Sequence, residues 1–408
     1  MTTPRSIVIV GGGLAGATAA FALREHGYDG ALSLVGAESH LPYERPPLSK
    51  DYLRGTKRIE TFRVEPREAY AQQEITLELG RRAVALDRTR RVVVLDNERA
   101  LPFDRLLLAT GSVPRRLGVA GEHLAGVHSL RNLEDADLIA RESADAEHVA
   151  VVGGGWIGSE VAASLREMGR DVTLVSRSEL PLGRFLGREI ASVYADLHRQ
   201  HGIRQVTGRV ESFTGRNHVE GVRLTGGDIV PAQLVVVGVG AAPDLGLADG
   251  AGLRTALGGI AVDAQLRSRD REIFAAGDIA AATHPAYGRR LRVEHWDNAR
   301  EQGKIAARNM LGEALPYARR PYFYSDQFDL GMEYRGVAVD VDDVVVSGDL
   351  EARAFCAFWL HEGRVVAAMN ANVWDAGDRL QALVERGPTL DRETLRAEGA
   401  NLKVPVGA

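Results

Sequence analysis

Two glycine-rich loops in the chain have the residue types and the spacing of a dinucleotide phosphate site. Gly11, Gly13 and Gly16 form one GxGxxG pattern, and the pattern returns at Gly153, 142 residues later. In such a loop the first glycine allows a tight turn after a strand. The second lets a pyrophosphate approach the backbone, and the third lets a helix pack closely on the strand. Because the phosphates bind amides at the positive end of that helix, we expect two dinucleotide sites.

Each loop lies in the strand–turn–helix–strand order that a dinucleotide site requires. Around the first loop, residues 6–10 predict a buried parallel strand, residues 17–26 a helix stopped by Gly27, and residues 31–35 a second strand. The second loop has the same neighbours, with strands at 149–152 and 171–175 and a helix at 159–168. The chain therefore repeats one nucleotide-binding unit.

Further apolar runs surround these two units. They predict strands at 75–79 and 91–95, further segments of the two units at 106–111, 234–239 and 273–279, and a helix at 298–310. After Pro316 the pattern alternates, predicting strands at 336–346, 353–360 and 364–370 and a helix near 378–385. We predict an α/β fold with two interleaved Rossmann-like dinucleotide-binding domains and a C-terminal α+β domain.

The composition excludes several classes of partner. The 408 residues carry a net charge of -5, so no overall basic field attracts nucleic acid. No run of about 18 uncharged apolar residues predicts a membrane span. The first residues lack the pattern of a signal peptide, so we expect a cytoplasmic protein.

Cys356 is the only cysteine. One thiol forms neither an internal disulfide nor a CxxC pair, which excludes an enzyme that passes electrons to a cysteine pair in its own chain. Any electrons that the chain collects must leave directly from its cofactor. We expect Cys356 to be an inert packed residue, and Trp359 and Trp374 to lie in the core or in an interface.

The residues after the second strand of each unit bear on which dinucleotide binds there. Glu38 lies 22 residues after Gly16, where a carboxylate binds ribose hydroxyls; a solvated loop glutamate is the alternative. The equivalent strand of the second unit ends in Ser176 and Arg177, without an acid. The guanidinium of Arg177, together with that of Arg184, suits a 2′-phosphate, which favours NADPH over NADH.

Several short motifs make the chain resemble a known family over essentially its whole length. They are RPPLSK at 45–50, ATG at 109–111, LRNLED at 130–135, GWIGSE at 155–160, AGD at 276–278, EHWDNA at 294–299 and YFYSDQ at 322–327. With them the chain resembles the FAD-dependent ferredoxin reductases of bacterial oxygenase systems. This family includes the putidaredoxin, rubredoxin and dioxygenase reductases and is related to apoptosis-inducing factor and glutathione reductase.

The resemblance implies that the first glycine loop, with Ala15, binds the FAD pyrophosphate. Arg45 would lie along the cofactor, and Arg131 would also approach it. Asp278 would accept hydrogen bonds from the ribityl hydroxyls and neighbouring amides. Trp296 would lie near the pyrimidine side of the flavin.

The resemblance also implies a catalytic pair. Lys50 would lie close to the flavin ring, and Glu160 would face the nicotinamide pocket and pair with Lys50. A cation there stabilises the negative charge that hydride transfer creates, and a carboxylate partner holds the cation in place. The alternatives are a surface lysine after a proline turn and a first-turn acid that favours the helix dipole.

We therefore assign Lys50 and Glu160 to catalysis. The residues assigned to cofactor binding are Gly11, Gly13, Leu14, Ala15, Gly16, Glu38, Arg45, Lys50, Ala83, Ala109, Thr110, Gly111, Arg131, Gly153, Gly155, Trp156, Ile157, Gly158, Glu160, Ser176, Arg177, Arg184, Gly240, Gly277, Asp278, Glu294, Trp296 and Tyr324. We predict no metal site. The chain departs from the family pattern at Ala37 and Ser176, where many members have an acid, and at Tyr324, where a tryptophan is common.

The expected FAD-binding domain comprises residues 1–112 and 246–318, with the NAD(P)-binding domain at 113–245 and the C-terminal domain at 319–408. The expected reaction is hydride transfer from NADPH or NADH to FAD. Single electrons would then pass to a [2Fe–2S] ferredoxin that supplies an oxygenase. We expect a monomer or a homodimer. Two alternatives stay open, an NAD(P)H oxidase or quinone reductase and a redox signalling protein similar to apoptosis-inducing factor.

Overall fold

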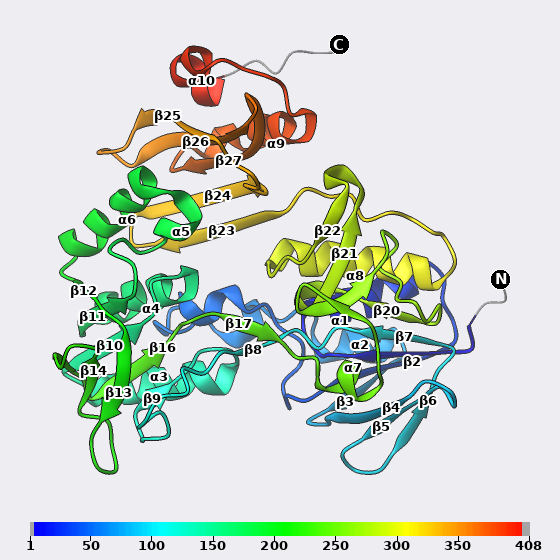
Figure 1. Ribbon diagram of the computed structural model, residues 1–408. Coiled ribbons are helices and arrows are strands. Elements are labelled where there is room, and N and C mark those ends of the chain that lie inside the picture. The colour runs from blue at the N-terminus through cyan, green and yellow to red at the C-terminus, as the bar shows by residue number, and fades with distance from the viewer. Residues whose placement is uncertain (1–3, 402–408) are drawn as a thin grey trace. The chain divides into compact units, whose positions relative to one another are not determined.

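The computed structural model describes residues 4–401, which form two compact units. The first unit contains the described residues up to Glu44, then Arg58–Val113 and Ala242–Pro321. The second contains Arg45–Lys57, Pro114–Ala241 and the described residues from Tyr322 onwards. Each unit is therefore built from three separate stretches of chain, which can be followed by colour in Figure 1.

The first unit is built around a parallel sheet whose strands run in the order β20-β7-β1-β2-β3. The strands are β1 (Ser6–Val10), β2 (Ala31–Gly36), β3 (Ile75–Leu79), β7 (Arg105–Leu108) and β20 (Ile273–Ala275). Helix α1 (Leu14–Glu25) connects β1 to β2. Because β1 has a neighbour on both sides and apolar residues on both faces, four of its five residues are buried.

Smaller sheets and helices complete the first unit. One antiparallel sheet contains β4 (Ala83–Asp87), β5 (Val92–Leu95) and β6 (Ala100–Pro102). A mixed sheet contains β18 (Thr255–Ala256), β19 (Gly259–Val262), β21 (Ala280–His284) and β22 (Arg289–Leu291). The remaining helices are α2 (Arg67–Gln72), α7 (Gly246–Gly250) and α8 (Trp296–Met310).

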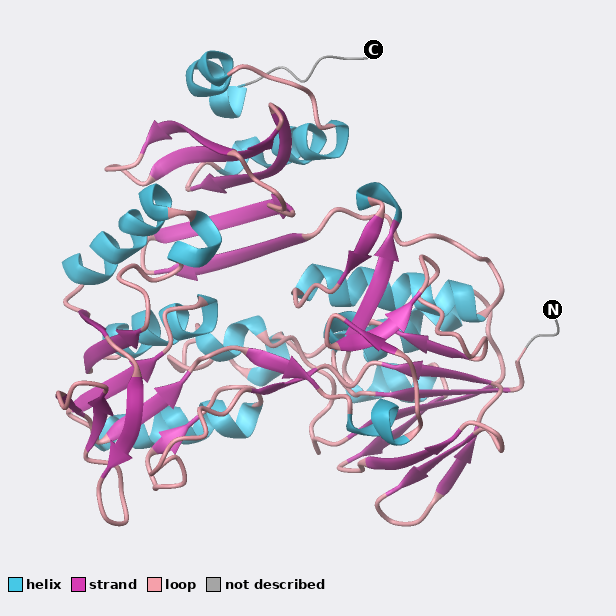
Figure 2. Ribbon diagram, in the orientation of Figure 1, coloured by secondary structure: helices cyan, strands magenta, loops and turns pink. Residues whose placement is uncertain are grey.

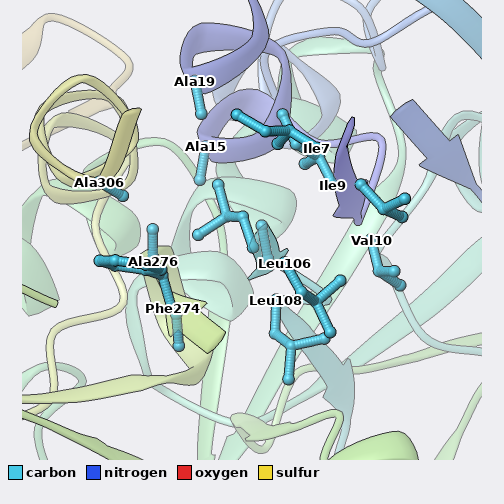
Figure 3. Packing of buried hydrophobic residues seen from close by; sticks show 14 of the residues in the cluster. Ile7, Ile9, Val10, Ala15, Ala19, Leu106, Leu108, Phe274, Ala276 and Ala306 are labelled. Carbon is cyan, nitrogen blue, oxygen red and sulfur yellow. The ribbon is translucent and has the colours of Figure 1, made fainter. Parts of the chain in front are cut away.

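Helices α1 and α8 pack against each other through small residues. A side chain added at Gly303 of α8 would bring its Cβ to 2.5 Å from the carbonyl oxygen of Ala15. Figure 3 shows Ala15 and Ala19 of α1 beside Ala306 of α8, with Leu106 of the sheet below them. The small side chains let the two helix backbones approach closely, so α8 supports the start of α1.

The second unit contains another parallel sheet, in the order β12-β11-β10-β16-β9. Its strands are β9 (Val127–His128), β10 (His148–Val152), β11 (Asp171–Ser176), β12 (Arg204–Thr207) and β16 (Leu234–Val237). Its helices are α3 (Leu133–Asp145), α4 (Trp156–Glu167), α5 (Gly183–Leu186) and α6 (Arg188–Gln200). A three-stranded antiparallel sheet adds β13 (Val210–Thr214), β14 (Gly221–Leu224) and β15 (Ile229–Pro231).

The same unit includes a five-stranded antiparallel sheet formed by the C-terminal part of the chain (Figure 2). Its order is β23-β24-β27-β26-β25, and the helices α9 (Gly377–Arg386) and α10 (Arg392–Glu398) follow it. The strands are β23 (Tyr322–Gln327), β24 (Leu330–Gly336), β25 (Asp343–Asp349), β26 (Ala354–His361) and β27 (Arg364–Ala371). Two parallel sheets, each with the helix of a glycine loop, and this third sheet confirm the predicted fold class.

Three predictions about local structure were wrong. The helices after the glycine loops begin at Leu14 and Trp156, three residues earlier than predicted, because the last residues of each loop already form the first helical turn. The range 336–346, predicted as one strand, contains the last residue of β24, a turn and the start of β25. Strand β24 ends at Gly336, whose φ of +89° favours glycine, and the chain turns before β25 begins. The alternating valines of this turn imitate the pattern of a strand.

The other predictions about single residues had mixed outcomes. Cys356 is 1% exposed, as expected of a packed residue, and burial raises the pKa of its thiol to about 11. Trp359 is buried in the core of the C-terminal sheet. Trp374 is 58% exposed, so it does not lie in the core, and the alternative position in an interface stays a prediction. Its indole lies over Gly331, where no side chain competes for the space.

No helix within residues 4–401 combines the length and the apolar character that crossing a membrane requires.

Candidate functional site

The first glycine loop is shaped by contacts that only glycine allows. Gly11 has a φ of +126°, and a Cβ there would collide with the carbonyl oxygen of Ala109. A Cβ at Gly16 would collide with the carbonyl oxygen of Gly11. Gly13 differs, because a Cβ there would meet no atom within 4 Å. Gly13 is also the N-cap of α1, and no side chain caps the helix. The loop thus presents uncapped amides to open space, which fits a bound phosphate.

Asp278 lies beside this loop and is placed there by its neighbours. A Cβ at Gly277 would lie 3.3 Å from the Cβ of Ala15, so the AGD segment packs on the first turn of α1. The Gly277 amide donates to Oε1 of Gln302 at 2.9 Å. The Ser112 hydroxyl donates to Oδ2 of Asp278 at 3.1 Å. The first unit thus offers amides and a carboxylate close together, a donor set that fits the pyrophosphate and hydroxyl groups of FAD.

Other residues predicted for the first cofactor lie around this core. The carboxylate of Glu38 accepts a hydrogen bond from the hydroxyl of Tyr43. Thr110 donates through Oγ1 to the carbonyl oxygen of Asp244 at 2.8 Å. The guanidinium of Arg300 lies 4.4 Å from the ring centroid of Trp296. Ala83, on β4, packs against the hydrophobic core.

The second glycine loop has the same construction as the first. Gly153 has a φ of +121°, and its Cβ would collide with the carbonyl oxygen of Gly238. A Cβ at Gly158 would collide with the carbonyl oxygen of Gly153. Gly155 is the N-cap of α4 without a capping side chain, and a Cβ there would meet nothing within 4 Å. This loop fits a second dinucleotide for the same physical reason.

The end of β11 lies next to this second loop. A Cβ at Gly154 would lie 3.0 Å from the Cβ of Ser176, the last residue of the strand. The hydroxyl of Ser176 donates to the carbonyl oxygen of Ser178 at 2.5 Å. Arg177 and Arg184 are both exposed, and within the described residues no hydrogen bond or ion pair holds either guanidinium. Arg177 directly follows the last residue of β11 and Arg184 lies on α5, so two exposed positive charges follow this strand along the chain.

A buried charge cluster surrounds Glu160 in the second unit. Glu160 lies on α4 and is 4% exposed. Its Oε2 is 3.2 Å from Nζ of Lys50, so the expected ion pair between these two residues is present. Oε2 also accepts from Ser49 at 2.5 Å, and Oε1 accepts from Ser325 at 2.7 Å. A buried ion pair that lacks further hydrogen bonds costs several kcal/mol in lost hydration. The bonds from Ser49 and Ser325 offset this cost for the carboxylate of Glu160.

Further predicted residues lie close to this cluster. Nζ of Lys50 is 5.2 Å from the ring centroid of Tyr324 on β23. The guanidinium of Arg45 donates to the carbonyl oxygen of Arg131. The second unit thus brings together Lys50, Glu160 and Tyr324, which come from three distant parts of the sequence.

The cluster also contains residues that the sequence analysis did not single out. Three of them lie inside the motifs at 45–50 and 322–327, which pointed to a functional role: Ser49, Ser325 and Gln327. Only the fold shows that Ser49 and Ser325 contact Glu160 directly and that Gln327 reaches it through Ser325. His198, on α6, extends the cluster, because its Nε2 lies 2.8 Å from Oε1 of Gln327. Among residues 4–401, no group of three or more histidines, cysteines, aspartates and glutamates could hold a metal ion.

Two family models match the chain. Residues 5–303 match the model described as pyridine nucleotide-disulphide oxidoreductase, and residues 322–405 match the model described as reductase C-terminal. Together they span most of both compact units.

Similar proteins match over nearly the whole length. A probable ferredoxin reductase of Castellaniella defragrans is 38% identical over 403 residues, 97% of each chain. The ferredoxin–NAD(+) reductase component of the p-cumate 2,3-dioxygenase system of Pseudomonas putida is 40% identical, covering 88% of each chain. The crystal structure of the covalent putidaredoxin reductase–putidaredoxin complex matches with a TM-score of 0.92 and 35% identity, covering 97% of this chain and 96% of the other. The chain therefore belongs to the pyridine nucleotide-disulphide oxidoreductase family, as an oxidoreductase of the ferredoxin reductase group that uses FAD and a nicotinamide dinucleotide.

Proposed function

We propose that this chain is an FAD-dependent NAD(P)H:ferredoxin oxidoreductase that delivers electrons to a [2Fe–2S] ferredoxin serving an oxygenase. The observation that carries the proposal is the pair of uncapped glycine loops, each at the start of a 12-residue helix and each open where a dinucleotide phosphate binds. The relatives support it, because two of them are named as ferredoxin–NAD(+) reductase components of dioxygenase systems. We further propose a cytoplasmic monomer or homodimer.

We assign FAD to the first loop and the nicotinamide dinucleotide to the second. Asp278 supports this assignment, because it lies beside the first loop and offers acceptors to the hydroxyl groups of FAD. We propose residues 1–112 and 246–318 as the FAD-binding domain, residues 113–245 as the NAD(P)-binding domain and residues 319–408 as the C-terminal domain. When bound, FAD supplies the chemistry that accepts a hydride and releases single electrons.

The protein's own residues hold a positive charge at a fixed position in the site. Glu160 holds the ammonium of Lys50 in one place. A fixed positive charge stabilises the negative charge that a hydride brings, and costs no rearrangement during the reaction. No thiol chemistry is needed, because Cys356 is buried and its raised pKa of about 11 keeps it protonated near neutral pH.

We propose NADPH as the preferred coenzyme. The two exposed arginines that follow β11 along the chain, Arg177 and Arg184, and the absence of an acid at Ser176 support this preference. Some relatives are named for NAD(+) and one for NAD(P)(+), so the coenzyme differs in name within the group.

The proposal is tested by mixing the purified flavoprotein anaerobically with NADPH or NADH in a stopped-flow spectrometer, and then with a [2Fe–2S] ferredoxin. We expect rapid loss of the flavin absorbance and rapid reoxidation by the ferredoxin. Reoxidation only by O₂ or a quinone would instead establish an oxidase or quinone reductase. Slow bleaching with both coenzymes would favour a signalling protein.

The same experiment separates the catalytic pair from general effects of substitution. Glu160→Gln removes the charge that holds Lys50, and we expect flavin reduction to slow by at least about tenfold. Glu167→Gln is the matched control, because Glu167 lies on the same helix but pairs with Arg54 near the surface. Equal rates for the two variants would remove Glu160 from the mechanism.

A further inference from the structure

A line of hydrogen bonds runs from Glu160 into the C-terminal sheet. Ser325 and Gln327 are two residues apart on β23, so their side chains leave the same face of the strand. Ser325 donates to Oε1 of Glu160 at 2.7 Å, and the Gln327 amide nitrogen lies 3.4 Å from the Ser325 hydroxyl. Gln327 Oε1 is 2.8 Å from Nε2 of His198 on α6. Each of these side chains is nearly completely buried.

The Gln327 side chain is oriented with its oxygen toward His198 and its amide nitrogen toward Ser325, and this orientation sets the direction of the hydrogens in the line. Burial lowers the pKa of His198 to about 4, so the ring is neutral near pH 7 and carries a single N–H. That N–H donates from Nε2 to the carbonyl oxygen of the Gln327 side chain, whose amide group then donates to Ser325. The only proton of the Ser325 hydroxyl is left for Glu160. The chain of hydrogen bonds from His198 through Gln327 therefore leaves the Ser325 hydroxyl as a donor to the Glu160 carboxylate.

The other carboxylate oxygen is held from a different part of the chain. Ser49 and Lys50 both donate to Oε2 of Glu160. The segment that carries them is tied to α4 by a second bond, in which Ser164 donates to the carbonyl oxygen of Ser49 at 2.7 Å. Glu160 is thus held on one side by residues 45–57 and on the other by β23. Removal of either support leaves the carboxylate held from one side only.

We propose that Ser325 is a positioning residue for hydride transfer. Backed by Gln327 and His198, it sets the orientation of the Glu160 carboxylate and, through it, the position of the Lys50 ammonium. This inference rests on the proposed function and deepens it, since it gives the C-terminal sheet a part in the reductive reaction. Catalytic groups need supports of this kind because small displacements from the productive geometry slow a reaction sharply.

Ser325→Ala tests the proposal in the flavoprotein. A hydrogen bond to a charged group contributes about 1.5–3 kcal/mol, which corresponds to roughly 10- to 150-fold. We therefore expect the limiting rate of flavin reduction to fall at least about tenfold. The dissociation constant of the oxidised coenzyme, from equilibrium titration, should change less than about twofold, because the phosphates bind at the glycine loop. A variant that is reduced at the wild-type rate overturns the proposal.

Ser347→Ala is the matched control. Ser347 lies on β25 of the same sheet and donates one hydrogen bond, to the carbonyl oxygen of Arg396 at 2.8 Å. Its removal should leave both the limiting rate and the dissociation constant unchanged. If Ser325→Ala does not fold, Gln327→Met replaces it, because this variant keeps the serine hydroxyl and removes only its backing. A smaller slowing, about two- to fivefold, is then expected, and an unchanged rate overturns the proposal.

A double-mutant comparison separates positioning from a general loss of packing. In a Glu160→Gln background, Ser325→Ala should slow reduction by less than about twofold, because the group that it positions is already altered. A full tenfold loss in that background overturns the proposal.

Hydrogen exchange followed by mass spectrometry gives a readout that does not depend on turnover. Ser325→Ala should raise exchange in residues 45–57 and at the start of α4, whereas Ser347→Ala should raise it only near β25 and α10. Unchanged exchange at Ser49, Lys50 and Glu160 contradicts the positioning role. A wild-type protein that neither coenzyme reduces would refute the proposed function instead, and the exchange data would still decide whether Ser325 supports Glu160.

Discussion

At the residue scale, the two kinds of positive charge in the second unit are used differently. Lys50 is buried and held by the carboxylate of Glu160, so its position is set before any ligand arrives. Arg177 and Arg184 are exposed and not held within the described residues. A buried, paired cation suits a fixed part in a reaction, whereas an exposed guanidinium is available to bind an incoming phosphate.

Arg177→Ala tests the coenzyme assignment at this scale. Loss of a charged hydrogen bond to the 2′-phosphate should weaken NADPH use by about 1–3 kcal/mol. In steady-state assays this corresponds to a fall of roughly 5- to 150-fold in kcat/KM for NADPH, with NADH unaffected. Arg188→Ala is the control, because Arg188 is also exposed but pairs with Glu179. An equal loss with both coenzymes would show that Arg177 does not recognise the phosphate.

At the scale of elements, the contact between α1 and α8 decides how the first glycine loop is supported. The first glycine loop leads directly into the first turn of α1. Gln302 and Gly303 of α8 contact this turn and the AGD segment beside it. Gln302 holds the amide of Gly277, and Gly303 faces the backbone of Ala15. The contact between the helices therefore connects packing directly to cofactor binding.

Gly303→Ala tests this contact. In a helix, glycine to alanine normally stabilises by about 0.5–1 kcal/mol. Here the new Cβ would lie 2.5 Å from the carbonyl oxygen of Ala15, so we expect destabilisation of about 1–3 kcal/mol and a lower flavin content after purification. Thermal unfolding and the ratio of flavin to protein absorbance measure the two effects.

Gly250→Ala, in α7, provides the opposite expectation for the same chemical change. A Cβ at Gly250 would meet nothing within 4 Å. This variant should be as stable as the wild type or more stable, and should keep its flavin. If Gly303→Ala behaves in the same way, the close approach of α1 and α8 does not support the cofactor.

At the scale of the whole molecule, each unit contains a histidine whose surroundings favour its neutral form. Burial lowers the pKa of His198, in the second unit, and of His295, in the first, to about 4. In the unfolded chain each has the ordinary value near 6.5. Between pH 6.5 and 4 the unfolded chain therefore binds more protons than the folded protein, so stability falls as the pH falls through this window.

Each histidine can contribute up to about 3 kcal/mol to this loss, from the difference between 6.5 and about 4. We expect the melting temperature to decline steadily between pH 6.5 and 4.5. The decline should be shallower in His198→Gln, whatever the stability of this variant at pH 7. His123→Gln, which changes an exposed histidine, should decline like the wild type. A His198→Gln slope equal to that of the wild type contradicts the prediction.

Much of this architecture could be predicted from the sequence. The glycine spacing encodes backbone contacts within a few residues, such as that of Gly16 with Gly11, and these do not depend on the rest of the fold. For the same reason the parallel strands beside both loops were predicted nearly to their ends. The lone cysteine already excluded a disulfide relay. The resemblance to a family supplied the ion pair between Lys50 and Glu160.

Only the tertiary structure decided what surrounds that pair. Ser325 meets Glu160 across 165 positions of sequence, and no local pattern connects a serine on one strand to a carboxylate on a distant helix. The turn after Gly336 was missed because alternating valines resemble a strand wherever they occur, and only the pairing of β24 with β27 shows where the strand stops. Local spacing determines turns and elements, whereas the partners of a buried polar group depend on how those elements pack.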